Sequence, residues 1–344
     1  MSLKLTLALL PYLTSALASP ANLQACQTPN AASPLTGCPP STLFVSPTNP
    51  LANYTTIQAA ITSLPTTTAP RTIVIDAGTY PEQLNITRPG PTTLLGKTPD
   101  PASISANLVK ITHSAANPDG AVYPDNAYTA TLTVASALNS SLTGSGPSGF
   151  PVPAGTPLGS IDFRAYNLNV TNEFAPYSAG PALALSVSYA NASLYHCDVS
   201  SYQDTVYVGK LGNAYLTSSV IAGQTDFLYG YGTLYVSNGT LRLRSCGGGI
   251  TAWKGSNTTG FANKYGVYLN ANRVVAENET VAQTEKGRCA LGRPWNSGHR
   301  SVFMGCYLDG TVRGQGYEIW DEGPDSHSII PGACFPACRW SPGL

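Results

Sequence analysis

Short hydrophobic stretches recur along the chain, and in several of them apolar residues alternate with polar ones between Gly, Asn or Pro residues. Alternation with a period of two is the pattern of a half-buried β-strand. The segments 161–172, 183–198, 214–221 and 233–244 repeat this pattern about every 20 to 25 residues. Together the stretches predict strands at 72–75, 92–95, 108–112, 130–134, 160–163, 168–171, 183–187, 192–195, 205–208, 214–217, 233–236 and 240–243.

One segment has a helical period instead. Between residues 54 and 64, Ile57, Ala60, Ile61 and Leu64 fall on one face of a helix. Repeated strands without intervening helices predict an all-β solenoid, with a sandwich or barrel as the alternative. The helix favours the solenoid, because a parallel β-helix must cover its first open coil. Residues 115–158 are then a loop excursion, and the region after about residue 245 an irregular C-terminal cap.

The N-terminus has the features of a secretory signal peptide. Lys4 precedes the apolar run 5–13, and a small-x-small pattern ends at Ala18. We therefore expect a signal peptide over 1–18, an irregular N-terminal arm over 19–50 and one solenoid domain over 51–344. No later run approaches the ~20 apolar residues that a membrane-spanning helix needs. The expected location is secreted and extracellular.

The cysteines and the glycosylation sequons agree with secretion. An even set of eight cysteines in an oxidising compartment makes disulfides the default. Cys26 with Cys38, and Cys334 with Cys338, would close short terminal loops, while the pairing of the inner four stays open. No two cysteines have the C-x2-C spacing and there are only four His, so a zinc site is not expected. Sequons that would make the protein a glycoprotein lie at Asn53, Asn85, Asn139, Asn169, Asn191, Asn238, Asn257 and Asn278.

Charge is scarce and balanced. Charged residues make up 10% of the chain, against about 25% in an average domain. The formal net charge is +0, so the composition argues against nucleic acid and anionic membranes as partners. The 18 Lys and Arg could still cluster into a basic groove for an acidic polymer.

Two aspartates are the candidate catalytic groups. The chain has no G-x-S-x-G elbow for a serine nucleophile and no H-E-x-x-H motif for metal-assisted hydrolysis. Asp204 and Asp226, by contrast, both lie among aromatic and β-branched residues, where a carboxylate is costly unless it has a partner or a task. Two such carboxyls can divide the work of nucleophile and proton donor if their environments separate their pKa values. This chemistry needs no metal and no organic cofactor.

Six short blocks in order give the chain a family resemblance. It resembles the pectin methylesterase (pectinesterase) family of carbohydrate esterases, in a fungal version. The blocks run through most of the mature chain: Gly78-Thr79-Tyr80-Pro81-Glu82, Ala182-Leu183-Ala184-Leu185, Tyr202-Gln203-Asp204-Thr205, Asp226-Phe227-Leu228-Tyr229-Gly230, Gly249-Ile250-Thr251-Ala252 and Leu291-Gly292-Arg293-Pro294-Trp295.

The resemblance implies a fold and a reaction. The fold is a right-handed, single-stranded parallel β-helix with a short N-terminal capping helix. The reaction is hydrolysis of methyl esters in homogalacturonan (pectin), giving pectate and methanol. Asp226 is then the nucleophile, Asp204 the general acid and base, and Gln203 a donor to the oxyanion. Arg293 pairs with Asp226 and keeps it ionised.

The resemblance also implies the contacts with substrate. Trp295, Tyr207 and Tyr229 are expected to offer flat faces to sugar rings, whereas Glu82 is expected to be structural. Methyl-esterified pectin is the expected partner of a protein that acts as a monomer.

One position departs from the family pattern. The family usually has Gln where this chain has Pro181, and proline has neither a side-chain donor nor a backbone N–H. Losing one oxyanion donor typically costs on the order of 10² to 10³ in rate. The alternative function is therefore a catalytically impaired, pectin-binding glycoprotein. A polygalacturonase or a lyase is less favoured, because the chain lacks an Asp-Asp pair and a calcium-binding acidic cluster.

Overall fold

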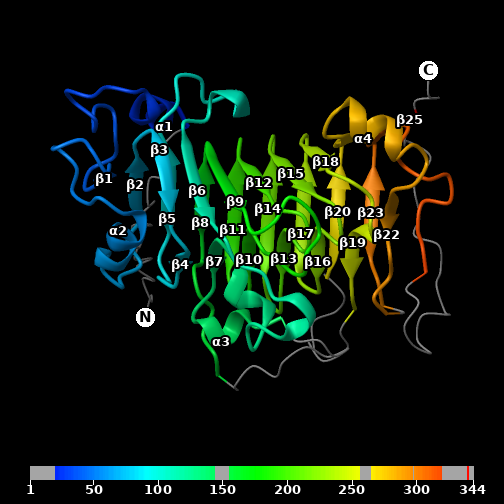
Figure 1. Cartoon of the computed structure of the whole chain (residues 1–344). Helices are drawn as coiled ribbons and strands as arrows, with labels where there is room; N and C mark the ends of the chain where they lie inside the picture. The colour runs from blue at the N-terminus through cyan, green and yellow to red at the C-terminus, as the bar shows by residue number, and fades with distance from the viewer. Residues whose placement is uncertain (1–19, 144–154, 256–264, 297, 320–338, 341–344) are drawn as a thin grey trace, which may run out of the picture.

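The chain forms three parallel β-sheets that wind around one long core (Figure 1). The structure is a computed structural model that describes residues 20–143, 155–255, 265–296, 298–319 and 339–340. Within these residues, sheets A and B have nine strands each, sheet C has seven, and every strand pair is parallel. The similarity to solved structures given below confirms the predicted parallel β-helix.

The strands enter the sheets in a repeating order. Sheet A consists of β1 (Leu43–Val45), β2 (Arg71–Ile75), β5 (Thr92–Gly96), β8 (Phe163–Tyr166), β11 (Asn191–Tyr195), β14 (Asn213–Thr217), β17 (Thr233–Ser237), β20 (Gly266–Asn270) and β23 (Ser301–Met304). Sheet B consists of β3 (Gly78–Pro81), β6 (Val109–His113), β9 (Leu168–Asn172), β12 (Asp198–Ser200), β15 (Val220–Gly223), β18 (Thr240–Leu243), β21 (Arg273–Ala276), β24 (Tyr307–Leu308) and β25 (Arg339–Trp340). Sheet C consists of β4 (Leu84–Ile86), β7 (Leu132–Val134), β10 (Leu185–Val187), β13 (Val206–Val208), β16 (Leu228–Gly230), β19 (Gly249–Trp253) and β22 (Ala290–Gly292).

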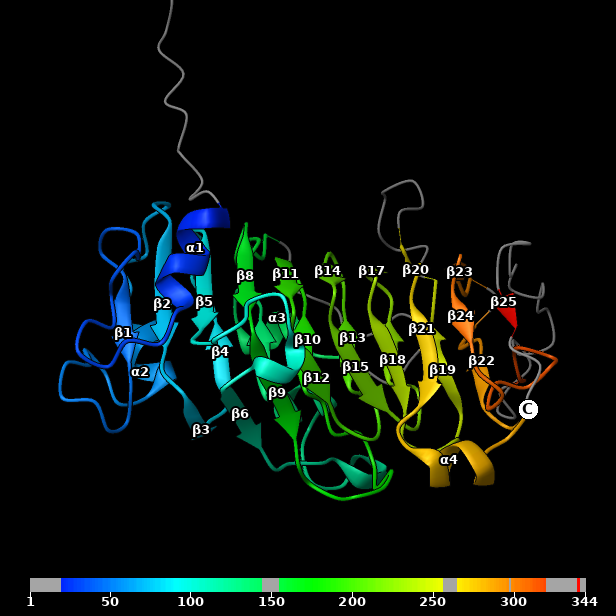
Figure 2. The same cartoon turned by 90° about the horizontal axis from the view of Figure 1, so that it is seen from above.

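In the coils of β8, β11, β14, β17 and β20, an equivalent position turns the chain from sheet A to sheet B. The strands of sheet B lie side by side in Figure 2. The residue directly after a sheet A strand adopts the left-handed conformation, which small polar residues tolerate best. This single-residue turn fixes the register of successive coils. Its members are Asn167, His196, Ser218, Asn238 and Ala271.

Aligned apolar side chains fill the interior. Leu194, Leu216, Val236 and Leu269 occupy the same register position on neighbouring strands of sheet A, and all are fully buried. Their polar neighbours along each strand face outward, which explains the alternation in the sequence.

The predicted helix over 54–64 is confirmed as α2 (Ile57–Ser63), which buries Ile57, Ala60 and Ile61. Its N-terminus is held by the Glu82 carboxylate, which accepts hydrogen bonds from the backbone N–H groups of Ile57 (2.8 Å) and Gln58 (2.9 Å). Thr56 is the N-cap. Glu82 therefore has a structural role, because a carboxylate satisfies donors that the first helical turn leaves unpaired.

We predict that Glu82→Gln lowers the free energy of unfolding by about 1 to 2 kcal/mol, because a neutral amide replaces a charge-assisted acceptor at a helix N-terminus. Denaturant unfolding measures the effect. Glu279→Gln, on the short exposed helix α4 (Glu279–Thr284), is the control and should change stability by less than about 0.5 kcal/mol. Equal stabilities of the two variants would contradict the assigned role.

Several predicted element bounds are wrong. The arm over 19–50 contains α1 (Pro20–Gln27) and β1, and β8 begins at Phe163, where the predicted strand 160–163 ends. The loop excursion over 115–158 contains the 3-10 helices η2 (Pro118–Gly120) and η3 (Asn126–Thr129) and the helix α3 (Leu138–Ser141). It also contains β7, which lies within the predicted strand over 130–134. A further 3-10 helix, η1 (Ile104–Ala106), precedes β6.

The irregular cap expected after about residue 245 is also wrong, because β19 to β24 continue all three sheets. Many of the strands that the sequence did not predict have only two to four residues, too few to show a period.

Two disulfides are present among the described residues. Cys26–Cys38 confirms the predicted N-terminal pair, and Cys246–Cys289 joins two of the inner cysteines. Cys197 and Cys306 are buried free thiols, so the default of disulfides is wrong for them. They follow β11 and β23, and these two strands are separated by four strand spacings, each about 4.8 Å. A disulfide needs Cα atoms within about 7 Å, so the two thiols are too far apart to form one. Cys334, Cys338 and the expected signal peptide lie outside the described residues.

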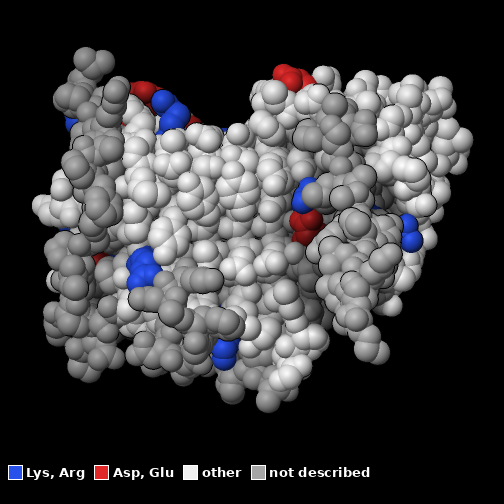
Figure 3. Space-filling model, turned by 180° about the vertical axis from the view of Figure 1, so that it is seen from behind, with Lys and Arg blue, Asp and Glu red and all other residues white. Residues whose placement is uncertain are grey.

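The outer face of sheet A carries few charges (Figure 3). Tyrosines line it: the rings of Tyr166 and Tyr195 stack with centroids 4.6 Å apart, and those of Tyr215 and Tyr235 are tilted with centroids 5.9 Å apart. An exception is the ion pair of Arg164 with Asp162 (2.8 Å). Among the described residues, no helix is long and apolar enough to cross a membrane.

Candidate active site

Asp204 and Asp226 lie at equivalent positions in neighbouring coils, where the chain passes from sheet B to sheet C. Asp204 precedes β13 and Asp226 precedes β16. Both adopt left-handed backbone conformations, with φ values of 59° and 47°. The backbone N–H of Asp204 donates to the Thr225 carbonyl (3.0 Å), and that of Asp226 donates to the Gly249 carbonyl (2.7 Å). Coil stacking thus places the backbones of the two residues one strand spacing apart, about 4.8 Å along the core axis.

Arg293 holds the carboxylate of Asp226. It follows β22, where its backbone N–H donates to the Thr251 carbonyl (3.0 Å). Its Nε lies 2.9 Å from Oδ1 and 3.1 Å from Oδ2 of Asp226, and one terminal nitrogen lies 2.5 Å from Oδ2. The backbone N–H of Gly249 also donates to Oδ1 (3.3 Å). A bidentate guanidinium pair fixes the orientation of the carboxylate as well as its charge.

The environments of the two acids separate their pKa values. Burial raises the pKa of Asp204 well above its ordinary range, and the neighbouring charge of Asp226 raises it further. Burial also raises the pKa of Asp226, but the Arg293 hydrogen bonds and charge and the Gly249 N–H oppose that rise. Asp226 is therefore the more acidic of the two, and the guanidinium pKa of Arg293 is raised in turn. The pair can hold one proton, carried by Asp204.

Gln203 lies beside the acids with its carboxamide oriented. Its Oε1 accepts hydrogen bonds from the Ser178 hydroxyl (2.8 Å) and the Gly180 backbone N–H (3.2 Å). A backbone N–H can only donate, so the oxygen must face this loop and the amide NH₂ must face the other way. Gln203 can therefore donate a hydrogen bond on the side away from the loop.

The three predicted aromatic residues form one cluster on sheet C with Tyr231. The side chain of Tyr207 is fully buried and that of Tyr229 is 4% exposed, with ring centroids 4.9 Å apart. Trp295 is half-buried, 6.5 Å from the Tyr229 ring, and the Lys254 ammonium lies 4.1 Å from the Trp295 ring centroid. Trp295 is thus the most accessible of the three predicted sugar contacts, and the two tyrosines form the layer beneath it.

A hydrogen-bonded chain supports the segment that carries Trp295. His299 Nδ1 donates to the Trp253 carbonyl (2.8 Å), so Nε2 accepts from the Ser301 hydroxyl (2.8 Å). Burial lowers the pKa of His299 to about 4, which keeps the ring neutral over most of the pH range. His299 therefore has the structural role that its surroundings indicate.

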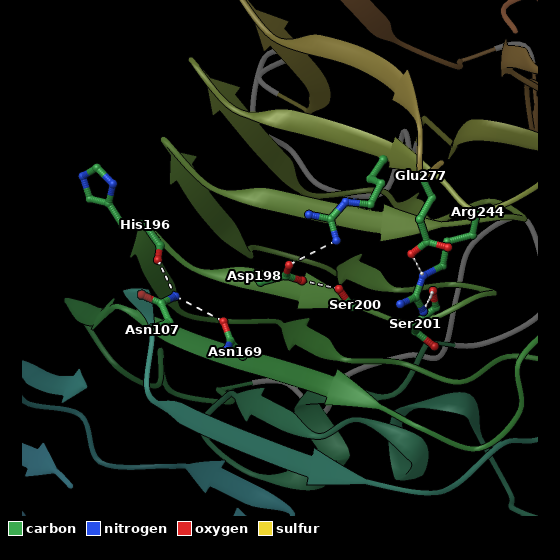
Figure 4. A network of polar contacts seen from close by, with 9 residues as sticks. Asn107, Asn169, His196, Asp198, Ser200, Ser201, Arg244 and Glu277 are labelled. Atoms are coloured by element: carbon green, nitrogen blue, oxygen red, sulfur yellow. Dashed lines mark hydrogen bonds and ion pairs between the residues drawn. The ribbon is translucent and has the colours of Figure 1, made fainter. Parts of the chain in front are cut away.

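A polar network on sheet B supports the turn before Asp204 from the other side (Figure 4). Arg244 donates to the Ser201 carbonyl (3.0 Å) and to Glu277 (3.1 Å), and its guanidinium lies 4.6 Å from the centroid of the Tyr202 ring. Tyr202 and Arg244 also line an open groove of about 810 Å³ over this sheet. The network fixes the main chain that leads into Gln203 and Asp204.

Comparisons with known proteins show the family of the chain. The family model described as Pectinesterase matches residues 154–332. A probable pectinesterase A from Neosartorya fischeri is 30% identical over 271 residues, covering 78% of this chain and 72% of that protein. The chain belongs to the pectinesterase family.

Solved structures show the same fold as this pectinesterase family member. The pectin methylesterase of Aspergillus niger superposes with a TM-score of 0.67 at 23% identity, covering 87% of this chain and 92% of that one. A pectin methylesterase in complex with a hexasaccharide gives a TM-score of 0.60 at 22% identity, with the same coverage.

Sequence reasoning did not find every residue of the site. Ser178 and Gly180 contact Gln203 only because a loop folds back over the coil, and nothing in their local sequence indicates it. The run Gly247-Gly248-Gly249 is a signal that the sequence does contain. A Cβ at Gly248 would lie 2.9 Å from Asp226 Oδ1, so only glycine leaves that carboxylate accessible.

Proposed function

We propose that this protein hydrolyses the methyl esters of galacturonate units in homogalacturonan, releasing pectate and methanol. The observation that carries the proposal is the buried Asp226 carboxylate. Arg293 holds it, and the less acidic Asp204 lies at the equivalent position of the neighbouring coil. Family membership supports the same reaction. The bound hexasaccharide in one related structure supports a pectin oligosaccharide as the ligand.

The reaction has two balanced steps. An oxygen of Asp226 attacks the ester carbonyl carbon, and the tetrahedral intermediate collapses as the methoxy oxygen takes the Asp204 proton and leaves as methanol. Asp204 then removes a proton from water, which attacks the acyl group, breaks its bond to Asp226 and releases the free uronic acid. Gln203 donates to the carbonyl oxygen while it carries negative charge, and Trp295 provides the sugar-facing ring.

The test is methanol release from highly methylated pectin, measured together with reducing ends and unsaturated products. Methanol alone supports the proposal, whereas binding without methanol supports the impaired, pectin-binding alternative that Pro181 suggests. We further propose that the protein acts outside the cell, as a monomer, and without a cofactor.

Arg293 gives a prediction for the pH dependence. Arg293→Met removes the hydrogen bonds and the charge that oppose burial, so the pKa of Asp226 rises. Because Asp226 must be ionised to attack, the acidic limb of the kcat/KM profile should move to higher pH, with kcat falling about 10²-fold or more. Arg242→Met removes an ion pair with Asp198 on sheet B and should leave that limb in place. An unmoved limb in Arg293→Met would contradict the assignment.

A further inference from the structure

Two glutamines of neighbouring coils are held by the same residue. The Ser178 hydroxyl donates to Gln203 Oε1 (2.8 Å), and the Ser178 backbone N–H donates to Gln224 Oε1 (3.2 Å). The N–H of Ser178 can only donate, so the oxygen of the Gln224 carboxamide faces the loop, as that of Gln203 does. Both amide NH₂ groups are therefore directed away from Ser178 in a defined orientation.

The coil register places Gln224 next to the acids. Gln203 pairs with Thr225, so Gln224 lies beside Tyr202, to whose carbonyl its backbone N–H donates (2.7 Å). In the preceding coil, Ala182 donates to the Gln203 carbonyl (3.1 Å), as Asp204 does to the Thr225 carbonyl (3.0 Å). Pro181 therefore lies in the row of Gln203 and Thr225, next to the row of Tyr202 and Gln224. Gln224 thus presents a side-chain amide one row away from position 181, which has none, and it precedes Asp226 by two residues.

Two glycines leave room between this amide and the nucleophile. A Cβ at Gly247 would lie 3.2 Å from Gln224 Nε2, and a Cβ at Gly248 would lie 2.9 Å from Asp226 Oδ1. Gly248 has a φ of +69°, which an L side chain rarely adopts. The Gln224 amide and the Asp226 carboxylate therefore border the same side-chain-free strip of backbone.

We propose that Gln224 is a catalytic residue whose amide donates a hydrogen bond to the anionic oxygen of the tetrahedral intermediate, beside Gln203. Ser178 is the positioning residue that orients both donors. The inference rests on the proposed esterase function and answers the question that Pro181 raises. A donor that is already oriented costs no reorganisation when the charge develops, which is the condition for a large effect on kcat.

The test is steady-state methanol release from methylated pectin. We expect Gln224→Met to lower kcat about 10²-fold with KM within about threefold, because the bond forms only in the transition state. The control Gln283→Met changes an exposed glutamine of α4 and should keep the kcat of the unmodified protein. Ser178→Ala should lower kcat about tenfold, and Ser178→Thr, which keeps the hydroxyl, should restore most of the loss.

Substitution at position 181 provides the second part of the test. Pro181→Gln should leave the otherwise unchanged protein within about threefold in kcat, but should recover at least about tenfold in the Gln224→Met background. A kcat for Gln224→Met equal to that of the unmodified protein would overturn the inference. So would a tenfold acceleration by Pro181→Gln alone, because the site would then lack a donor.

The two proposals fail in different ways. If the unmodified protein releases no methanol, the proposed function fails and this inference fails with it. If it releases methanol and Asp226→Asn does not, the function stands, and the Gln224 series alone then decides the inference.

Discussion

Asp226→Asn is expected to lower methanol release at least about 10⁴-fold while the protein stays folded, because an amide cannot form the acyl intermediate. Arg293 holds this carboxylate with Nε and a terminal nitrogen together. An isosteric amide keeps the shape of the site and removes only the charge and the nucleophilicity. The measurement is methanol release together with thermal unfolding.

The matched control is Asp162→Asn, directly before β8 of sheet A. Asp162 also binds an arginine through two nitrogens, with distances of 2.9 and 2.8 Å to Arg164. This variant loses the same kind of ion pair on the outer face of sheet A, so it reports the structural part of the change. We expect full activity from it. Asp226→Asn turnover above about 1% of the unmodified rate would rule out Asp226 as the nucleophile.

The fold was predictable because each coil of the solenoid has a local sequence pattern that indicates its strand and its turn. Strand β14, for example, alternates the buried Leu216 with the outward-facing Tyr215, and the left-handed residue Ser218 follows directly. Strands of three residues such as β12 and β16 carry no readable period, so they were found only through their pairing with neighbours. The separation of Cys197 from Cys306 likewise follows from their coils and is not visible in their spacing.

The site residues likewise differ in whether the sequence alone could indicate them. Asp204, Asp226 and Arg293 stand in blocks that the sequence shows directly, and the coils bring these three together. Ser178 and Gln224 have no such block, because their relation depends on a loop that crosses two coils. A linear sequence cannot show that position 181 and Gln224 lie in adjacent rows of neighbouring coils.

Asp204→Asn should separate the two steps of the reaction. Without the proton of Asp204, methoxide must leave unprotonated, so methanol release should fall about 10² to 10⁴-fold. A galacturonate ester with a good leaving group, such as 4-nitrophenol, needs no such proton. Acylation of Asp226 by this ester should therefore survive in Asp204→Asn. Release of the acyl group needs Asp204 as the base, so this second step should be lost.

Rapid mixing of Asp204→Asn with a 4-nitrophenyl ester of a short oligogalacturonide should therefore give a burst of about one nitrophenolate per site, followed by slow turnover. Asp204→Glu keeps a carboxyl group and should show turnover with a smaller burst, and Asp226→Asn should show none. Equal losses on the methyl and nitrophenyl esters without a burst would contradict the proposed role. Asp204 would then act on neither the leaving group nor the water, and its raised pKa would reflect burial alone.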